Sequence, residues 1–405
     1  MSEFRSFAEG RGKGQRSSHA PVAGAAGKFP IQSAKFQDPH FPFQELPTPN
    51  GPAPFRYNLS KFLDPADLQL IQSAGTLVFH TVGDTGDYRG RQQDFVAALM
   101  TEDADQQPAN LKPAFFYHLG DVVYFAGDID KYGDNFYETY RDYPAFIVAI
   151  PGNHDCQPDD PQDGPVDPDK KPLDGWIQNF MSKTPGQLGS LKTGSNRTQM
   201  DLPNVYWTLN TPFATIIGLF SNVGENEGEI HQDQIDWFRS ELTAADPNIA
   251  LVVTVHHPPF SGDVDHSGSG EVASVLFDSF NTTGIYPHLI LSGHVHNYQR
   301  FTPTIATSKG NISVPCVVAG NGGYTNLGKL HKVDGKYPDA PFKISDTLTL
   351  EQYDQTNFGF LRMEITESTI TANYFSAPYA VSGSPQGQLH DKFAIDIASR
   401  IVKTL

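Results

Sequence analysis

Cysteine is scarce in this chain, which holds only Cys156 and Cys316. Two cysteines cannot build the disulfide framework of a small secreted domain, so they are either free thiols or one bridge. Long apolar runs are lacking too, because no stretch approaches the ~18 consecutive apolar residues of a membrane helix. Scattered Arg and Lys near the N-terminus are followed by no apolar segment, which argues against a secretory signal. We therefore expect a soluble, cytoplasmic protein.

Positive charge is also in short supply. The chain carries 29 Lys and Arg against 46 Asp and Glu, which gives a formal net charge of −17. Long-range repulsion makes nucleic acid an unsuitable partner for such a chain, and the lack of a membrane helix leaves no membrane partner to expect. An anionic ligand such as a phosphate ester would need positive charge supplied locally, which metal ions can provide.

Aromatic side chains are abundant, with 28 Phe and 16 Tyr, and 38% of all residues are hydrophobic. A chain of this composition can bury a sizeable core. Residues 1–51 are rich in Gly, Ser, Ala and Pro, and a short helix is expected over 65–71 with Asp64 as its N-cap. These features divide the chain into an N-terminal arm or linker (1–70), one main domain (71–378) and a C-terminal tail (379–405).

Apolar segments of strand length alternate with helical patterns along the main domain. Strands that run into Gly-polar loops and are followed by helices are typical of an α/β fold. The expected strands are 76–82, 114–119, 145–150, 249–255 and 289–292, with a hairpin across 205–220, whereas helices are expected over 92–101, 136–143 and 232–244, and strands and turns past 314.

Five polar stretches follow directly after expected strands. Taken singly, each has an ordinary structural explanation, such as a helix cap for Asp84, a turn for Asn153 or a satisfied core histidine for His256. Taken together, carboxylate, amide, phenol and imidazole groups at one edge of a sheet suit a pair of first-row metal ions. Two ions ~3.5–4 Å apart need a bridging carboxylate, and Asp121 is the central candidate. In chain order the stretches contain Asp84 and Asp87, Asp121 and Tyr124, Asn153 and His154, His256, and His294 and His296.

The stretches form five intact sequence blocks, and through them the chain resembles the calcineurin-like metallophosphoesterase superfamily, most of all its purple acid phosphatases. The resemblance covers 76–323 and makes 71–378 a metallophosphoesterase domain. It implies a four-layer α/β (α+β) sandwich of two mixed β-sheets flanked by helices, with metals at the strand C-termini. The blocks are Gly83-Asp84-Thr85-Gly86, Gly120-Asp121-Val122-Val123-Tyr124, Gly152-Asn153-His154-Asp155, Val253-Thr254-Val255-His256 and Gly293-His294-Val295-His296.

The resemblance also implies a role for each polar side chain. His154 would lie just outside the metal ligands and face the phosphate, and Asp155 would orient it. His266, about ten residues after the fourth block, matches a substrate-facing histidine of the family. Asp84, Asp121, Tyr124 and His296 would hold the first metal, and Asp121, Asn153, His256 and His294 the second.

The tyrosine among these ligands points to Fe(III) as the first metal. A free tyrosine has a pKa of about 10, so only a strongly acidic cation makes it a phenolate ligand near neutral pH. The second metal would be Fe, Zn or Mn. The alternative is that Tyr124 packs beside a pair of Mn²⁺ or Zn²⁺ ions without binding them.

Two details separate branches of the superfamily. Many relatives begin with Asp-x-His, in which the histidine binds the first metal, but Gly86 stands at that position here. Coordination by Tyr124 would fill the vacated position. Protein phosphatases of the superfamily have Asp-Arg-Gly after the second block, whereas this chain has Tyr124-Phe125-Ala126, which argues against that branch.

These residues predict hydrolysis of small phosphate monoesters by attack of a metal-bound hydroxide, with His154 and His266 stabilising the transition state and protonating the leaving oxygen. A phosphodiesterase acting on cyclic nucleotides or other diesters is the nearest alternative, since loops such as 157–172 and 190–204 would set that preference. A binding module that has lost catalysis is a third possibility, against which the intact His154 and His266 count.

Overall fold

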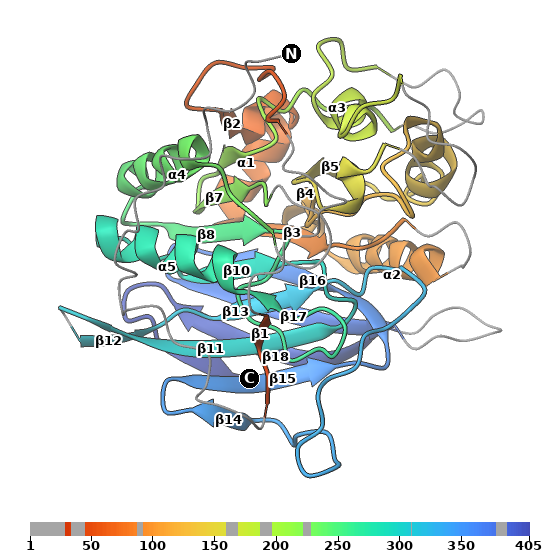
Figure 1. Cartoon of the computed structure of the whole chain (residues 1–405). Coiled ribbons are helices and arrows are strands. Elements are labelled where there is room, and N and C mark those ends of the chain that lie inside the picture. The colour runs from red at the N-terminus through yellow and green to blue at the C-terminus, as the bar shows by residue number, and fades with distance from the viewer. Residues whose placement is uncertain are drawn as a thin grey trace, which may run out of the picture.

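Two large mixed β-sheets lie at the centre of the molecule and are flanked by helices (Figure 1). The computed structural model describes residues 29–33, 45–86, 92–158, 169–186, 197–221, 228–308, 310–377 and 387–405. Asp87, most of the loop at 157–172 and the first part of 190–204 lie outside these ranges. The expected architecture of two mixed sheets with flanking helices is confirmed.

The seven-stranded sheet carries the first three expected strands in parallel, as β3 (Leu77–Val82), β4 (Phe115–His118) and β5 (Phe146–Ala149). On the other side of β3 lies β16 (Phe358–Ile365), which runs antiparallel to it. The order is β19-β18-β17-β16-β3-β4-β5, completed by β17 (Thr369–Ala377), β18 (Gln388–Asp396) and β19 (Val402–Thr404). The proposed domain boundary at 379 stays a prediction, but β18 and β19 come from residues beyond it and extend the same sheet.

The ten-stranded sheet has β8 (Ala250–Val255) and β10 (Leu289–Ser292) at its centre, with β7 (Ala214–Leu219) and β13 (Cys316–Ala319) parallel to them. The expected hairpin is confirmed, since β6 (Trp207–Asn210) pairs antiparallel with β7. The order is β14-β15-β11-β13-β10-β8-β7-β6-β2 with β12 beside β11, and the remaining strands are β2 (Arg56–Asn58), β11 (Tyr298–Thr307), β12 (Gly310–Ser313), β14 (Phe342–Ser345) and β15 (Leu348–Asp354).

The central strands are buried along their whole length. β8 reads Ala-Leu-Val-Val-Thr-Val, and each of its six residues is buried, as are the six residues of β3 and of β7. Apolar and β-branched residues suit strands that are covered on both faces. These strands therefore form a rigid support for the polar loops that begin where they end.

Three expected helices are present. α1 (Pro65–Ala74) begins after Asp64, whose side chain accepts N–H groups of the first turn at 2.9 Å, and ends at Gly75 with a φ of 64°. α2 (Gln92–Gln106) contacts β16, and α4 (Gln232–Ala244) contacts β7. α3 (Asp174–Phe180) and α5 (Gly270–Thr283) are additional helices, and α5 packs beside α4 (Figure 1).

The helix expected over 136–143 is wrong. A short π-helical turn covers Gly133–Tyr137, and turns continue to Asp142. Phe136, Tyr140 and the neighbouring rings are buried, so aromatic packing, rather than helical periodicity, accounts for the apolar pattern that favoured a helix.

Part of the expected N-terminal arm packs against the main domain. β1 (Gln32–Ser33) pairs in parallel with β9 (Gly268–Ser269). The carbonyl oxygen of Ile31 accepts the N–H of Ser261 at 3.0 Å, and the side chains of Phe29 and Ile31 are buried. This segment therefore lies beside the loop that carries His266. No helix within the described ranges is long and apolar enough to cross a membrane.

Candidate metal centre

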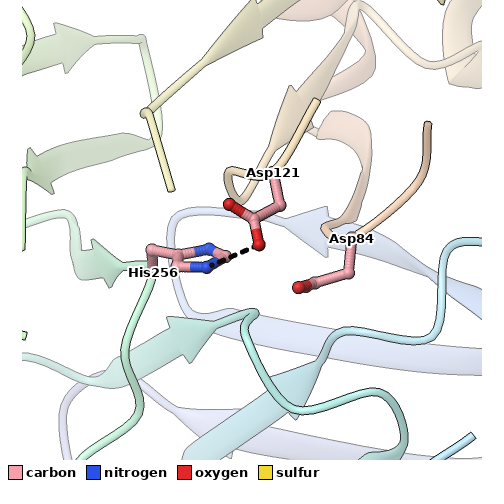
Figure 2. A group of neighbouring side chains, drawn as sticks. All are labelled: Asp84, Asp121 and His256. Atoms are coloured by element: carbon pink, nitrogen blue, oxygen red, sulfur yellow. Dashed lines mark ion pairs between the residues drawn. The ribbon is translucent and has the colours of Figure 1, made fainter. Parts of the chain in front are cut away.

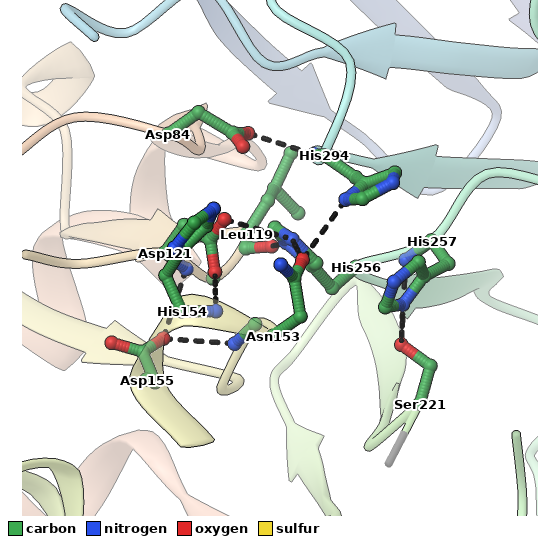
Figure 3. Close-up of polar contacts among 12 residues, drawn as sticks. Asp84, Leu119, Asp121, Asn153, His154, Asp155, Ser221, His256, His257 and His294 are labelled. Atoms are coloured by element: carbon green, nitrogen blue, oxygen red, sulfur yellow. Dashed lines mark hydrogen bonds and ion pairs between the residues drawn. The ribbon is translucent and has the colours of Figure 1, made fainter. Parts of the chain in front are cut away.

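The five polar stretches meet where the ends of strands from both sheets face each other. Asp84, Asp121 and Asn153 follow β3, β4 and β5 of the seven-stranded sheet, whereas His256 and His294 follow β8 and β10 of the ten-stranded sheet. Asp84 Oδ2 accepts the backbone N–H of His294 at 2.8 Å and so links the two sheets directly (Figure 3). All seven side chains expected to bind metal are buried.

One group of donors gathers around the hydroxyl of Tyr124. This hydroxyl lies 3.1 Å from Asp84 Oδ1, 2.8 Å from Asp121 Oδ2 and 3.3 Å from His296 Nε2. His296 Nε2 is also 3.7 Å from Asp84 Oδ1. The structure thus brings together the four side chains expected at the first metal.

A second group gathers around the side-chain oxygen of Asn153. His256 Nε2 lies 3.1 Å and His294 Nδ1 2.9 Å from Asn153 Oδ1 (Figure 3). His256 Nε2 is 3.3 Å from Asp121 Oδ2, the same carboxylate oxygen that contacts Tyr124 in the first group. Figure 2 shows Asp121 between His256 and Asp84. One ligand atom from each of these three residues lies within 4.8 Å of the other two. Asp121 therefore belongs to both groups.

The tautomer of His256 shows that this arrangement fits a cation. His256 Nδ1 lies 2.8 Å from the carbonyl oxygen of Leu119, which can only accept, so Nδ1 carries a proton. In neutral His256 the lone pair of Nε2 then faces oxygens of both Asp121 and Asn153. The imidazole nitrogen and the two oxygens repel one another at these distances unless a proton or a metal ion lies between them. Burial alone would lower the pKa of His256, but Asp121 outweighs it and raises that pKa to about 9.

The two carboxyl groups respond differently to their surroundings. Burial raises the pKa of Asp84 well above its ordinary value, and the nearby Asp121 adds to this. Burial also acts to raise the pKa of Asp121, but the charges of His256 and His154 overcome it, and the net shift is downward. Burial, Asp121 and Asp84 together raise the pKa of Tyr124 well above its usual value. Without a cation, the tyrosine is therefore a neutral phenol, and its single proton is nearest to Asp121 Oδ2 at 2.8 Å.

Three of the gathered residues have a left-handed backbone. The φ angles of Asp84, Asp121 and His294 are 58°, 55° and 68°. Non-glycine residues in this region cost of order 1–3 kcal/mol each, and such strain concentrates at functional sites. The surrounding buried strands hold the backbone of these three residues in this unfavourable conformation.

Two glycines of the sequence blocks are needed for the close approach of chains. A Cβ atom on Gly152 would lie 2.1 Å from Asp121 Oδ1, and one on Gly86 would lie 2.2 Å from the carbonyl oxygen of Val122. The second distance leaves no room for a side chain at position 86 with the backbone in this conformation. A side chain there would displace the backbone that carries Asp121 and Tyr124.

The structure places the rings of His154 and His266 beside the side chains expected to bind metal. The ring of His154 lies 4.5 Å from the ring of Tyr124, and His154 Nδ1 is 2.7 Å from the carbonyl oxygen of Phe125. The half-buried ring of His266 lies 5.1 Å from that of His294 and 5.0 Å from that of His296.

The Asp155 carboxylate accepts hydrogen bonds from backbone N–H groups of two loops at the centre. Its Oδ2 accepts the N–H group of Asp121 at 2.9 Å (Figure 3). The same oxygen accepts the N–H of Gly152 at 2.8 Å, and Oδ1 accepts that of Val122 at 3.1 Å. These contacts describe a support for the loops of Asp121 and Asn153, and the expected role of Asp155 in orienting His154 stays a prediction. Burial, together with the Asp121 charge, raises the pKa of Asp155 to about 7.

Two neighbours of the centre were not identified from the sequence. The ring of Tyr324 stacks on that of Tyr124 at 4.1 Å and lies 4.7 Å from that of His296. His257 Nδ1 is 2.7 Å from Ser221 Oγ, and its ring lies 4.2 Å from that of His294. The histidine pair of which His257 is the second member was a visible signal, but no local pattern connects Tyr324 to the site.

The family model for calcineurin-like phosphoesterases matches residues 77–298. Because this match covers more than half of the chain, the protein belongs to the calcineurin-like phosphoesterase family. Membership implies a phosphoesterase hydrolase that uses metal ions, and it agrees with the resemblance noted in the five sequence blocks.

Two curated proteins are similar to this chain in sequence over about a third of its length. Purple acid phosphatase 21 of Arabidopsis thaliana is 28% identical over 141 residues, which are 34% of this chain and 30% of that protein. A protein named "Probable cyclic nucleotide phosphodiesterase" of Rhodococcus erythropolis is 33% identical over 139 residues, which are 34% of this chain and 42% of that protein. The matched part is thus less than half of either relative.

Solved structures share the fold at low sequence identity. Purple acid phosphatase PPD1 from yellow lupin (Lupinus luteus) has a TM-score of 0.53 and 17% identity, over 79% of this chain and 54% of that one. GAP50, described as the anchor in the inner membrane complex of Plasmodium, has a TM-score of 0.54 and 15% identity, over 80% of this chain and 90% of that one. These similarities establish the two-sheet metallophosphoesterase fold.

Proposed function

We propose that the protein hydrolyses small phosphate monoesters with two metal ions, in the manner of a purple acid phosphatase. The observation that carries this proposal is the sharing of Asp121 Oδ2 between two donor groups, one around Tyr124 and one around Asn153. A single metal ion would occupy only one of these donor groups. Two-metal hydrolases, in contrast, need one carboxylate that is common to both ions.

The two groups differ in chemical character, which supports different ions. The Tyr124 group has two carboxylates, a phenol and an imidazole, and we assign Fe(III) to it because hard anionic ligands favour that ion. The Asn153 group has one carboxylate, an amide oxygen and two imidazoles, and suits Fe, Zn or Mn. When bound, the pair would neutralise phosphate oxygens and make a water molecule acidic enough to ionise near neutral pH.

The contacts of His154 support a role for it in proton transfer. The contact of its Nδ1 with the carbonyl oxygen of Phe125 requires a proton on Nδ1. Nε2 is therefore the nitrogen through which His154 would give a proton to a leaving oxygen. His266, beside the His294 and His296 rings, would contact the phosphate or the leaving group and thereby orient the ester.

A phosphodiesterase acting on cyclic nucleotides or other diesters is the second candidate. The name of the Rhodococcus erythropolis relative favours it, at 33% identity over 139 residues. Both candidates use the same donor groups, so the metal ligands do not distinguish them.

Hydrolysis of a panel of esters tests the proposal, followed as inorganic phosphate released from the monoesters and as the phenol or nucleoside monophosphate released from the diesters. The panel contains an aryl phosphate monoester, a nucleoside monophosphate, a bis-aryl phosphate diester and a 3′,5′-cyclic nucleotide, and elemental analysis of the same sample counts the metals. We expect two metal ions per chain and at least about tenfold higher kcat/KM for monoesters than for diesters. Preference for diesters would replace the proposal by the second candidate. Two metals without hydrolysis of any ester would indicate a binding module.

A further inference from the structure

The position of His266 depends on the loop between β8 and α5. Residues 257–268 leave the end of β8, pass over the centre and return to β9, where α5 begins. His266 lies near the end of this loop, with its ring about 5 Å from two ligand imidazoles. A loop that carries a substrate-facing side chain must be held rigidly, because a misplacement of ~1 Å at an active site can cost 10²-fold in rate.

A buried carboxylate, Asp263, holds the backbone of this loop. Its side chain is 0% exposed, and its Oδ1 accepts the N–H groups of both Asp265 and His266 at 2.9 Å. Its own N–H donates to Ser261 Oγ at 3.1 Å. A carboxylate that accepts two successive backbone donors fixes the turn that leads into His266.

The other carboxylate oxygen connects this turn to a metal-ligand loop. Asp263 Oδ2 accepts Asn297 Nδ2 at 2.9 Å, and Asn297 directly follows His296 in the chain. Asn297 Oδ1 accepts Gln299 Nε2 at 2.8 Å, while Gln299 Oε1 accepts the N–H of Gly262 at 2.8 Å. The network therefore runs from the His296 loop back into the His266 loop and closes on itself.

The backbone at 328–329 packs closely against Asp263. A Cβ atom on Gly328 would lie 2.3 Å from Asp263 Oδ2 and 3.3 Å from Asn297 Nδ2. On the same side, the N–H of Val264 donates to the carbonyl oxygen of Lys329 at 2.8 Å. The carboxylate is thus confined between the backbone at 328–329 and the Asn297 amide.

We propose that Asp263 is the positioning residue for His266, and that its bond to Asn297 sets the distance between His266 and the metal ligand His296. The kinetic part of this proposal rests on the proposed function, whereas the positional part does not. Asp263 itself contacts neither substrate nor metal in this role, and it acts through the backbone of residues 265 and 266.

The Asp263–Asn297 pair allows a test by exchange of the two side chains. Asp263→Asn keeps an oxygen for the two backbone N–H groups but turns an amide donor toward the Asn297 amide donor, so their bond is lost. Asn297→Asp added to Asp263→Asn restores one donor and one acceptor between the two side chains, with the polarity reversed, but loses the bond from Asn297 Nδ2 to the Gly328 carbonyl oxygen at 3.3 Å. Gly328→Ala disturbs the same pair sterically without changing its chemistry. Gly186→Ala is its control, because among the described residues a Cβ atom there meets only the Thr184 carbonyl oxygen, at 3.9 Å.

Hydrogen exchange in the metal-loaded full chain tests the positional part without any enzyme assay. We expect the amides of Asp265 and His266 to exchange about tenfold faster in Asp263→Asn and in Gly328→Ala, and to return toward the wild-type rate in the double exchange. Unchanged exchange at these two amides in Asp263→Asn would overturn the proposal, whether or not the protein hydrolyses esters. Equal acceleration in Gly186→Ala would overturn it as well.

A double-mutant cycle with His266→Ala tests the kinetic part. For an aryl phosphate monoester, kcat/KM should fall by about tenfold in Asp263→Asn. In the His266→Ala background the same substitution should change kcat/KM by less than about twofold, because the residue to be positioned is gone. Equal losses in both backgrounds would mean that Asp263 acts independently of His266, which contradicts the proposal.

Asp354 provides the matched control for a purely structural effect. It is also buried, at 3% exposure, and its Oδ1 accepts the N–H groups of Thr356 at 2.9 Å and Asn357 at 3.1 Å. Asp354→Asn should therefore cost stability as Asp263→Asn does, but leave kcat/KM within about twofold of wild type. A tenfold loss in Asp354→Asn would show that any weakened buried turn has this effect and would refute the special role of Asp263.

Discussion

Removal of the Asp155 carboxylate is the perturbation that tests most directly how the centre is built. Asp155 is fully buried and accepts three backbone N–H groups, from Asp121, Val122 and Gly152, at 2.8–3.1 Å. Asp155→Ala leaves these donors buried without an acceptor. Two of the donors belong to the strand-end turn that presents Asp121, so the substitution should affect both folding and metal binding.

The expected loss follows from the three bonds. At a pH above the Asp155 pKa of about 7 the carboxylate is charged, and a hydrogen bond to a charged acceptor contributes roughly 1.5–3 kcal/mol, although such contributions within one network do not add fully. We therefore expect Asp155→Ala to lower the free energy of unfolding by about 3–5 kcal/mol. Asp155→Asn keeps one oxygen for the N–H groups of Asp121 and Gly152 but turns a donor toward that of Val122, so about 1–3 kcal/mol should be lost.

Urea denaturation of chelator-treated protein measures these losses without a contribution from bound metal. Asp64→Ala is the matched control, since Asp64 also accepts two backbone N–H groups at 2.9 Å but is exposed at the start of α1. Its loss should be about 1 kcal/mol, as for other helix caps. In a parallel titration with Zn²⁺, Asp155→Ala should bind about 10–100-fold more weakly.

The reasoning would be refuted if Asp155→Ala were no more destabilising than Asp64→Ala. Such a result would mean that solvent or neighbouring groups replace the carboxylate at no cost. Normal Zn²⁺ affinity combined with a large loss of stability would refute only the link between the turn and the metal ligands.

Four further substitutions test individual assignments. Asp121→Asn should reduce metal content by more than half, because its carboxylate is common to both donor groups; full occupancy by elemental analysis would contradict the bridging role. His154→Ala should lower kcat by ~10²–10⁴ with metal content unchanged, whereas loss of metal would make His154 a ligand. Tyr124→Phe should remove the visible absorption expected of oxidised, iron-loaded protein, and a colourless wild type would exclude Fe(III)-phenolate. Burial, with the nearby Arg400 charge, lowers the pKa of His288 to about 4, so the folded state binds fewer protons than the unfolded state between that value and the ordinary ~6.5. Stability should therefore fall by up to ~1.4 kcal/mol per pH unit as pH drops through this range, and denaturation at several pH values should give a shallower slope for His288→Asn.

The donor residues could be predicted from the sequence because the chemistry leaves a local mark. Asp84, Asp121, His256 and His294 lie within three residues of the end of a buried apolar strand, and Asn153 lies four residues after one. Asp84, Asp121, Asn153 and His294 each directly follow a glycine, whereas Tyr124 and His296 come three and two residues after a donor of the same loop. Gly152 has no room for a side chain because of its contact with Asp121. The glycines of the sequence blocks therefore mark positions where the chain approaches the donor residues closely. The division into two donor groups followed from the family resemblance, and the structure assembles the same two groups.

The supporting residues could not be predicted in this way. Asp155 was recognised, but its three backbone partners come from two different loops. Asp263 and Asn297 are 34 positions apart and show no pattern that would pair them. α5, in contrast, had usable signals that were overlooked, since Ser269 caps its first turn and Gly284 ends it with a φ of 70°.

The pairing of β3 with β16 has a consequence for how the protein is made. The strand that presents Asp84 has Thr81 opposite Leu361 and Leu77 opposite Ile365. A ribosome therefore completes β3, β4 and β5 long before it supplies the strand that closes their open side. Until then, the backbone of β3 is an exposed edge of apolar residues, which favours pairing with other chains. Overproduction should accordingly be limited by aggregation of nascent chains, and slower translation or a chaperone that covers β3 should raise the yield more than added metal would.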